Sequence, residues 1–221
     1  VRTIKNGDNK ILLASNMAMD SGDYVKVYAW KDGVNSAPTS IIANWTIPTW
    51  ASRRFGDQFT VCGDWTKGEM WFKDMNAGAI GSYNIVDGAI SGGLNGWGTI
   101  GGAYLGSVYR YNVTDPNMLI VPGASDAYLY NLNTTSSTEI TKSYGYIGGL
   151  TPFTYNEKQF IAYVTVPKLG AKTAKLVVIE DQENSFSALN DNLVVFETDL
   201  NAPDNEQTIG NGTGMCCNVV T

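Results

Sequence analysis

One strand pattern recurs four times along this 221-residue chain, and no other feature of the sequence limits the fold as strongly. Each copy is an apolar or alternating run, followed by a polar turn and a second short β-prone run. The four runs cover residues 25–30, 69–74, 127–132 and 174–179. Their central residues are Val27, Trp71, Leu129 and Val177. Taken as equivalent, these positions lie 44, 58 and 48 residues apart, which is typical of propeller blades.

Further strand-like runs flank each copy. The preceding runs cover residues 11–15, 59–63, 117–121 and 159–166, and the following ones cover residues 39–42, 79–85, 138–141 and 186–189. The sequence therefore predicts an all-β fold made of antiparallel repeats with three or four strands each. Helical periodicity is close to absent, and only residues 188–192 indicate a single helical turn.

Such a small sheet is marginal alone, because both of its faces and both of its edges need cover. Radial stacking of four-stranded repeats meets both needs, so we predict a β-propeller or a propeller fragment, with a β-sandwich as the alternative. We expect residues 1–221 to form a single domain of about four to five repeats. A further strand would begin at residues 215–220, so either that strand closes the ring or the chain is a fragment of a longer one.

Two segments carry a family resemblance. They are Asp57-Gln-Phe-Thr-Val-Cys-Gly-Asp-Trp-Thr-Lys-Gly-Glu-Met-Trp71 and Val27-Tyr-Ala-Trp-Lys-Asp-Gly-Val-Asn-Ser-Ala-Pro-Thr39, and the run Gly-Asn-Gly-Thr-Gly at 210–214 is of the same kind. These segments resemble uncharacterised exported propeller-like proteins of gut Bacteroidetes, a domain-of-unknown-function family. The resemblance implies a secreted protein or surface lipoprotein near glycan-handling systems, and it implies no established activity.

Composition agrees with export and argues against several partners. Charged residues make up 16% of the chain, below the roughly 25% of an average soluble protein. The net charge of −6 and the absence of a Lys/Arg cluster argue against nucleic acid as a partner. No apolar stretch is long enough to predict a transmembrane segment. We therefore expect an extracellular or cell-surface protein, with an N-terminus trimmed before Val1.

The absence of histidine removes Ser-His-Asp and Cys-His catalysis and imidazole metal sites, so the sequence leans away from an enzyme. Four acids near aromatic residues could hydrolyse a glycosidic bond, but acids in turns commonly bond nearby amides instead. They are Asp57, Asp64, Asp74 and Asp87.

No cofactor or metal is predicted from the other motifs. Residues 96–101 match G-x-G-x-x-G but precede a poor helix, so they predict a flexible inter-blade or strand-edge segment rather than a nucleotide site. Residues 6–9 and 20–23 offer oxygen ligands in a pattern that hairpin turns also use. The three cysteines are odd in number, and two are adjacent, so they do not predict a disulfide framework. We expect Cys62, Cys216 and Cys217 to be buried small residues, and a single bridge from Cys62 to one of the other two stays open.

All six tryptophans lie within the first 97 residues. Sugar rings stack on indole, so the tryptophans in loop-like contexts are the candidate ligand-binding residues, with packing between repeats as the competing interpretation. These candidates are Trp45, Trp50, Trp65 and Trp97. Trp30 and Trp71 lie within expected strands and are assigned to the core.

The predicted function is a non-catalytic, cell-surface or secreted binding module for a glycan or a protein ligand. Two alternatives stay open, a carboxylate-based enzyme acting on polysaccharide and a structural component of a surface assembly.

Overall fold

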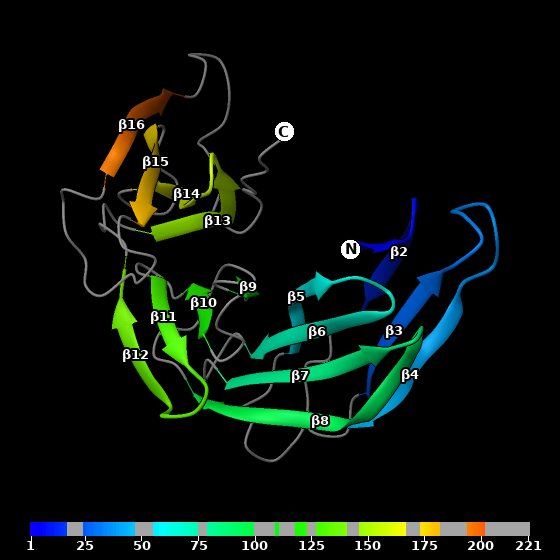
Figure 1. Cartoon of the computed structure of the whole chain (residues 1–221). Coiled ribbons are helices and arrows are strands. Elements are labelled where there is room, and N and C mark those ends of the chain that lie inside the picture. The colour runs from blue at the N-terminus through cyan, green and yellow to red at the C-terminus, as the bar shows by residue number, and fades with distance from the viewer. Residues whose placement is uncertain are drawn as a thin grey trace. The chain divides into compact units, whose positions relative to one another are not determined.

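The protein is described by a computed structural model, and all regular structure in its described residues is β-strand (Figure 1). The model describes residues 1–16, 24–46, 55–74, 79–99, 109–110, 118–122, 127–140, 146–166, 173–181 and 194–201. No helix occurs among these residues, and the helical turn expected at 188–192 lies outside them. Sixteen strands form four antiparallel sheets of four strands each, which confirms the predicted all-β class of four-stranded repeats. Sheets of this kind are consistent with propeller blades and with the layers of a sandwich.

The first two sheets are simple meanders in chain order. The first comprises β1 (Arg2–Asn6), β2 (Asn9–Ser15), β3 (Tyr24–Trp30) and β4 (Thr39–Thr46). The second comprises β5 (Phe55–Gly63), β6 (Lys67–Asp74), β7 (Ala79–Val86) and β8 (Ala89–Thr99). Short turns explain the order, because consecutive strands joined by a few residues pair with each other.

The remaining strands repeat this arrangement. The third sheet comprises β9 (Tyr109–Arg110), β10 (Met118–Pro122), β11 (Ala127–Asn131) and β12 (Ser136–Glu139). The fourth comprises β13 (Tyr146–Tyr155), β14 (Lys158–Val166), β15 (Thr173–Asp181) and β16 (Val194–Asn201). The chain groups into two compact units, residues 1–103 with 107–109 and residues 104–106 with 110–221. The first unit contains the first two sheets.

The four recurring runs are all inner strands, but one copy is out of phase. The runs at 25–30, 127–132 and 174–179 belong to third strands, β3, β11 and β15, whereas the run at 69–74 belongs to a second strand, β6. The equivalence of Trp71 with Val27 is therefore wrong. Both inner strands of a sheet alternate in the same way, so the hydrophobic pattern does not distinguish the second from the third. The run expected at 186–189 lies outside the described residues, and the last strand among those residues is β16.

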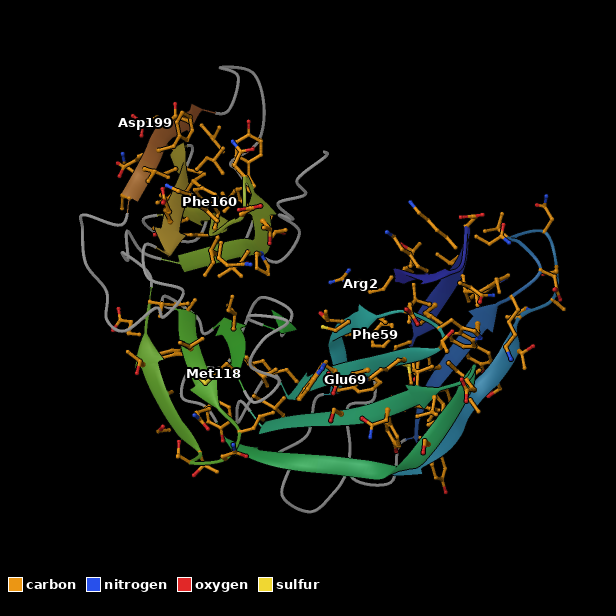
Figure 2. All side chains as sticks on the ribbon, in the orientation of Figure 1. Arg2, Phe59, Glu69, Met118, Phe160 and Asp199 are labelled. Atoms are coloured by element: carbon orange, nitrogen blue, oxygen red, sulfur yellow. The ribbon has the colours of Figure 1, made fainter. Side chains whose placement is uncertain are left out.

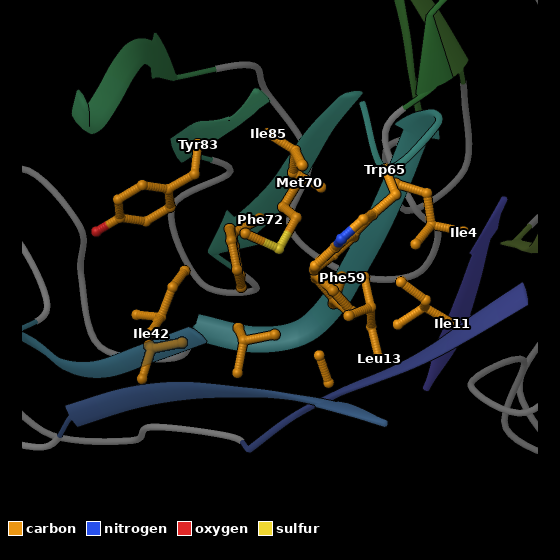
Figure 3. Close-up of a cluster of buried hydrophobic side chains, with 13 residues drawn as sticks. Ile4, Ile11, Leu13, Ile42, Phe59, Trp65, Met70, Phe72, Tyr83 and Ile85 are labelled. Atoms are coloured by element: carbon orange, nitrogen blue, oxygen red, sulfur yellow. The ribbon is translucent and has the colours of Figure 1, made fainter. Parts of the chain in front are cut away.

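The core of the first unit lies between its two sheets (Figure 3). Each strand contributes alternate side chains, as the two-residue period of a strand requires. The first sheet supplies Ile4, Ile11, Leu13, Val25, Val27, Ala29 and Ile42, and the second supplies Phe59, Trp65, Met70, Phe72, Tyr83 and Ile85. Phe72 contacts two of these rings, with centroids 5.2 Å from Phe59 and 6.3 Å from Tyr83. The first sheet therefore has one face in the core, and its other face decides what the sheet can bind.

Candidate functional site

The side chains of β3 alternate between the two faces of the first sheet. Val25, Val27 and Ala29 are fully buried in the core, whereas the residues that alternate with them are half-buried or exposed. We call the side opposite the core the outer face. It consists of Thr3, Lys5, Lys10, Leu12, Ala14, Tyr24, Lys26, Tyr28, Trp30 and Ser40.

A row of aromatic residues runs along the outer face on β3. At roughly 3.3 Å per residue, Tyr28 and Trp30 are separated by about 7 Å, and Tyr24 and Tyr28 by about 13 Å. Tyr24 is 49% exposed. Across the sheet, Tyr28 is flanked by Ala14 on β2 and Ser40 on β4, and these small residues leave room beside its ring. Figure 1 shows these strands in blue, and Figure 2 adds their side chains.

Asn16 fixes the backbone at the start of this row. Its side-chain Oδ1 accepts a hydrogen bond from the Lys26 backbone N–H at 2.5 Å, and its Nδ2 donates to the Tyr24 carbonyl at 2.9 Å. The Asn16 backbone N–H also donates to the Lys26 carbonyl at 3.2 Å. Three hydrogen bonds from one residue hold Tyr24 and Lys26 in register where the β2–β3 pairing ends.

The sequence pattern assigned Trp30 to the core, and this assignment is wrong. Trp30 is half-buried on the outer face, because its position alternates with Ala29 rather than matching it. Tyr24 and Tyr28 were not identified from the sequence. The signal was present, since Tyr-Val-Lys-Val-Tyr-Ala-Trp interleaves an aliphatic set with an aromatic set.

Of the four predicted ligand-binding tryptophans, only Trp65 has a described side chain. It is 7% exposed and lies among core residues that include Ile4 and Phe59 (Figure 3). The Lys31 ammonium lies 5.4 Å from the centroid of its ring, within the range of a cation–π interaction. Little of this indole is left for a ligand, so the competing interpretation, packing, describes its surroundings better.

The other three tryptophan candidates stay predictions. Trp45 lies in β4 and Trp97 in β8, so their expected loop contexts are wrong. Both strands form because they pair with an inner strand, β3 or β7, which overrides the local polar or Gly-rich sequence. Trp50 lies outside the described residues.

Of the four acids, Asp64 and Asp87 have described side chains, and both lie in turns between strands. Asp64 Oδ1 accepts hydrogen bonds from the backbone N–H groups of Thr66 and Lys67, both at 2.8 Å, and so closes the turn between β5 and β6. These two bonds, from Lys67 first and then Thr66, lower the pKa of Asp64. Asp87 has φ 46° in the turn between β7 and β8. Asp57 and Asp74 lie within β5 and β6.

A buried lysine lies on the second sheet. Lys73 and Trp71 alternate with the core residues Met70 and Phe72 on β6, and each is 1% exposed. Burial lowers the pKa of Lys73 to about 8. Trp71 Nε1 donates a hydrogen bond to Glu69 Oε2 at 3.1 Å. Since Lys73 is shielded from solvent, we assign its effect to stability rather than to ligand capture.

The remaining motifs form ordinary β structure. Gly96 and Gly98 lie in β8, an edge strand of the second sheet, and residues 100–101 lie outside the described parts. Residues 6–9 form the tight turn between β1 and β2, and residues 20–23 are not described. Cys62 lies on β5 and is half-buried rather than fully buried as expected, and Cys216 and Cys217 lie outside the described residues.

A metal-binding cluster and a membrane-spanning helix are both absent from the described ranges. No group of three or more acids or cysteines there is arranged to hold a metal ion. Within the same ranges, no helix has the length and apolarity needed to cross a membrane.

No protein-family model matches the chain, and no curated protein sequence matches it at a significant level. Its fold is similar to the crystal structure of a DUF4623 family protein from Bacteroides eggerthii DSM 20697, with a TM-score of 0.69 and 18% sequence identity. The match covers 92% of this chain and 48% of the other, so this chain spans about half the length of that neighbour. The chain thus shares its fold with a protein from a domain-of-unknown-function family of Bacteroides, in agreement with the resemblance predicted from its sequence.

Proposed function

We propose that this protein is a non-catalytic binding module that holds a linear glycan on the outer face of its first sheet. The observation that carries the proposal is the row of Tyr24, Tyr28 and Trp30 along one strand. Aromatic rings offer flat apolar surfaces to the C–H faces of sugars, and tyrosine and tryptophan add a polar group at the edge. Three rings in line suit a chain of sugars better than a single terminal sugar.

A glycan suits this surface better than a protein ligand. Protein interfaces usually bury an apolar centre and keep polar groups at the rim. Here the charged Lys26 lies between Tyr24 and Tyr28, and Ser40 lies beside Tyr28, so polar groups are mixed into the aromatic row. Sugars combine apolar faces with hydroxyl groups and therefore match such a mixture.

Binding is favoured over cleavage because of the residue types on the outer face. Hydrolysis of a glycosidic bond by the usual route needs two carboxyl groups on either side of the bond. The outer face as defined above contains lysines but no Asp or Glu. A carboxylate-based enzyme would therefore need a site elsewhere.

We further propose that the sheets are propeller blades and that the protein is exported, either secreted or held at the cell surface as a lipoprotein. The repeated four-stranded meander supports the first part. The low charged fraction of 16% supports the second.

A glycan array tests the proposed function directly. The double variant Tyr28→Ala/Trp30→Ala is expected to weaken binding by about tenfold or more, because it removes two stacking rings. Tyr155→Ala is the matched control, since Tyr155 is an exposed tyrosine in the fourth sheet. Trp45→Ala and Trp97→Ala in the same array test the two remaining tryptophan predictions. If the wild-type protein binds no glycan, or if the double variant binds as well as the control, the proposal is wrong.

One observation favours a second candidate, a structural component of an assembly. The edge strand β16 exposes several apolar side chains, with Phe196 at 50% and Leu200 at 37% exposure. Exposed apolar edge strands tend to associate with other chains. Light scattering tests this candidate, which requires a stable oligomer that Phe196→Ser dissociates.

A further inference from the structure

The outer face carries an unbalanced positive charge in an acidic protein. Lys5, Lys10 and Lys26 all belong to it, whereas the whole chain has a net charge of −6. No described carboxylate forms an ion pair with any of the three. The face thus has a charge opposite to that of the molecule.

Two of these three lysines, Lys5 and Lys10, are cross-strand neighbours. They are directly opposite each other on the antiparallel strands β1 and β2, and both are exposed. Like charges at directly opposed positions destabilise a sheet. The next pair on this face is Thr3 on β1 and Leu12 on β2, and Leu12 also lies opposite Trp30 on β3. The lysine pair therefore lies on the same surface as the aromatic row.

In the fourth sheet of the same chain, exposed lysines form ion pairs with acids. There, Lys158 pairs with Glu180 at 2.6 Å, and Lys175 pairs with Glu197 at 2.8 Å and Asp199 at 3.0 Å. Its exposed lysines therefore have acids on neighbouring strands. The strands of the first sheet contain no acid. Asp8 lies in the turn between β1 and β2, and Asp64 forms a β-bridge with Lys5, but neither carboxylate forms an ion pair with Lys5 or Lys10. An anion from outside would therefore complete the charge pattern there.

We infer that the outer face selects an acidic glycan, a linear chain whose sugars carry carboxylate or sulfate groups. This inference rests on the proposed function, because the aromatic row supplies the surface on which the sugar rings stack. Lys26, between Tyr24 and Tyr28, faces an anionic group on a sugar within the row, and the Lys5–Lys10 pair faces one beyond Trp30. Lysine suits this role because its ammonium group is a compact charge that needs no fixed planar partner.

Nucleic acid is the other polyanion to consider, and the face fits it less well. Binding a nucleic acid backbone uses many phosphate contacts, often from arginine. Three lysines and no arginine on the outer face provide few such contacts.

The test measures binding of the intact chain to polygalacturonate, chondroitin sulfate, neutral xylan, polyglutamate and single-stranded DNA. The first two separate carboxylate from sulfate, xylan lacks the charge, and polyglutamate lacks the sugar rings. We expect at least one acidic glycan to bind about tenfold more tightly than xylan at low salt, and this preference to shrink as salt is raised.

The variant Lys5→Gln/Lys10→Gln is expected to weaken binding of the acidic glycan by about threefold to tenfold and to leave xylan binding unchanged. Lys67→Gln/Lys158→Gln is the matched control, since it changes the net charge equally on other sheets. Loss of a repulsive pair should keep the first variant folded, and its thermal midpoint verifies this.

The outcomes separate the inference from the proposed function. If neutral and acidic glycans bind equally and the lysine variant changes nothing, the inference is wrong and the proposed function stands. If polyglutamate or DNA binds as tightly as the acidic glycans, sugar recognition is not the basis of binding and the inference is also wrong. If no glycan binds, both fail.

Discussion

Lys5 and Lys10 occupy directly opposed positions on β1 and β2, so two positive charges share one cross-strand pair. Such a pair costs stability that an opposite charge would recover. Both residues are exposed, and the interaction is therefore modest and sensitive to salt.

Lys10→Glu should therefore stabilise the protein by about 0.3 to 1 kcal/mol at low ionic strength, with a smaller gain in 0.5 M salt. Urea unfolding at the two salt concentrations measures the effect. Lys5→Glu should act alike, and the double variant Lys5→Glu/Lys10→Glu should lose the gain because it restores a like-charge pair. Additive gains in the double variant would contradict the pairing.

Lys73 predicts an unusual dependence of stability on pH. Its pKa is about 8 in the folded protein and 10.5 in the unfolded chain, so the unfolded state binds more protons between these values. The free energy of unfolding should rise from pH 8 upward, and the buried charge costs about 3 kcal/mol below pH 8. Lys73→Met should raise stability at pH 7 by about 1 to 3 kcal/mol and remove this rise.

Titration of Tyr83 sets the highest pH at which the effect of Lys73 on stability can be measured alone. Burial raises its pKa to about 12, so above pH 10 the unfolded state loses a proton that the folded state keeps, and stability falls. Unfolding curves between pH 7 and 9.5 therefore isolate the lysine. Equal slopes for the wild type and Lys73→Met in that range would show that Lys73 titrates normally.

Gly88 is closely packed against Trp65. A Cβ atom at this position would lie 2.7 Å from Trp65 Nε1, and the residue has φ 77°. Gly88→Ala should cost about 2 to 4 kcal/mol, because it combines backbone strain with displacement of a core indole. Gly33→Ala is the control, since Gly33 has φ 92° but no atom within 4 Å of the added Cβ, and it should cost only the strain, about 1 kcal/mol. Thermal unfolding compares the two, and equal losses would rule out a packing effect at Gly88.

Asp64 should contribute to stability as a carboxylate. Its pKa is lowered in the folded state, so its contribution is present above the usual value of 3.8 and disappears as the pH falls through the folded pKa. Asp64→Asn keeps an oxygen acceptor for Thr66 and Lys67 but removes the charge. The difference in urea midpoint between wild type and variant should be clear at pH 6 and shrink as the pH is lowered below 3.8. A difference that persists in acid would mean that the charge is not the cause.

The repeat pattern predicted the existence of the inner strands well, but it did not predict which strands lie beside them. Each sheet contains an edge strand that the pattern did not identify as part of the repeat, namely β1, β8, β9 or β13. The pattern also missed β16, because it placed a run at 186–189 instead. Edge strands bury fewer side chains, so they carry a weaker hydrophobic period. In β8, glycines further obscure the pattern, and pairing with β7 decides the conformation.

The candidate site was missed for a different reason. In β3, aliphatic and aromatic side chains alternate, and both sets are apolar on a hydrophobicity scale. Which set enters the core depends on the sheet that packs against the strand. Trp65, by contrast, follows a turn that resembles an exposed loop, yet the core cluster encloses it.

The sequence by itself determined the β class, the presence of a repeated strand unit and the absence of histidine chemistry, because strand periodicity and residue types are local properties of a chain. Only the tertiary structure decided that Tyr24, Tyr28 and Trp30 face outward and that Lys5 and Lys10 meet on the same side. Those facts depend on strand register and on which face a neighbouring sheet covers, and both are fixed by contacts between residues distant in sequence.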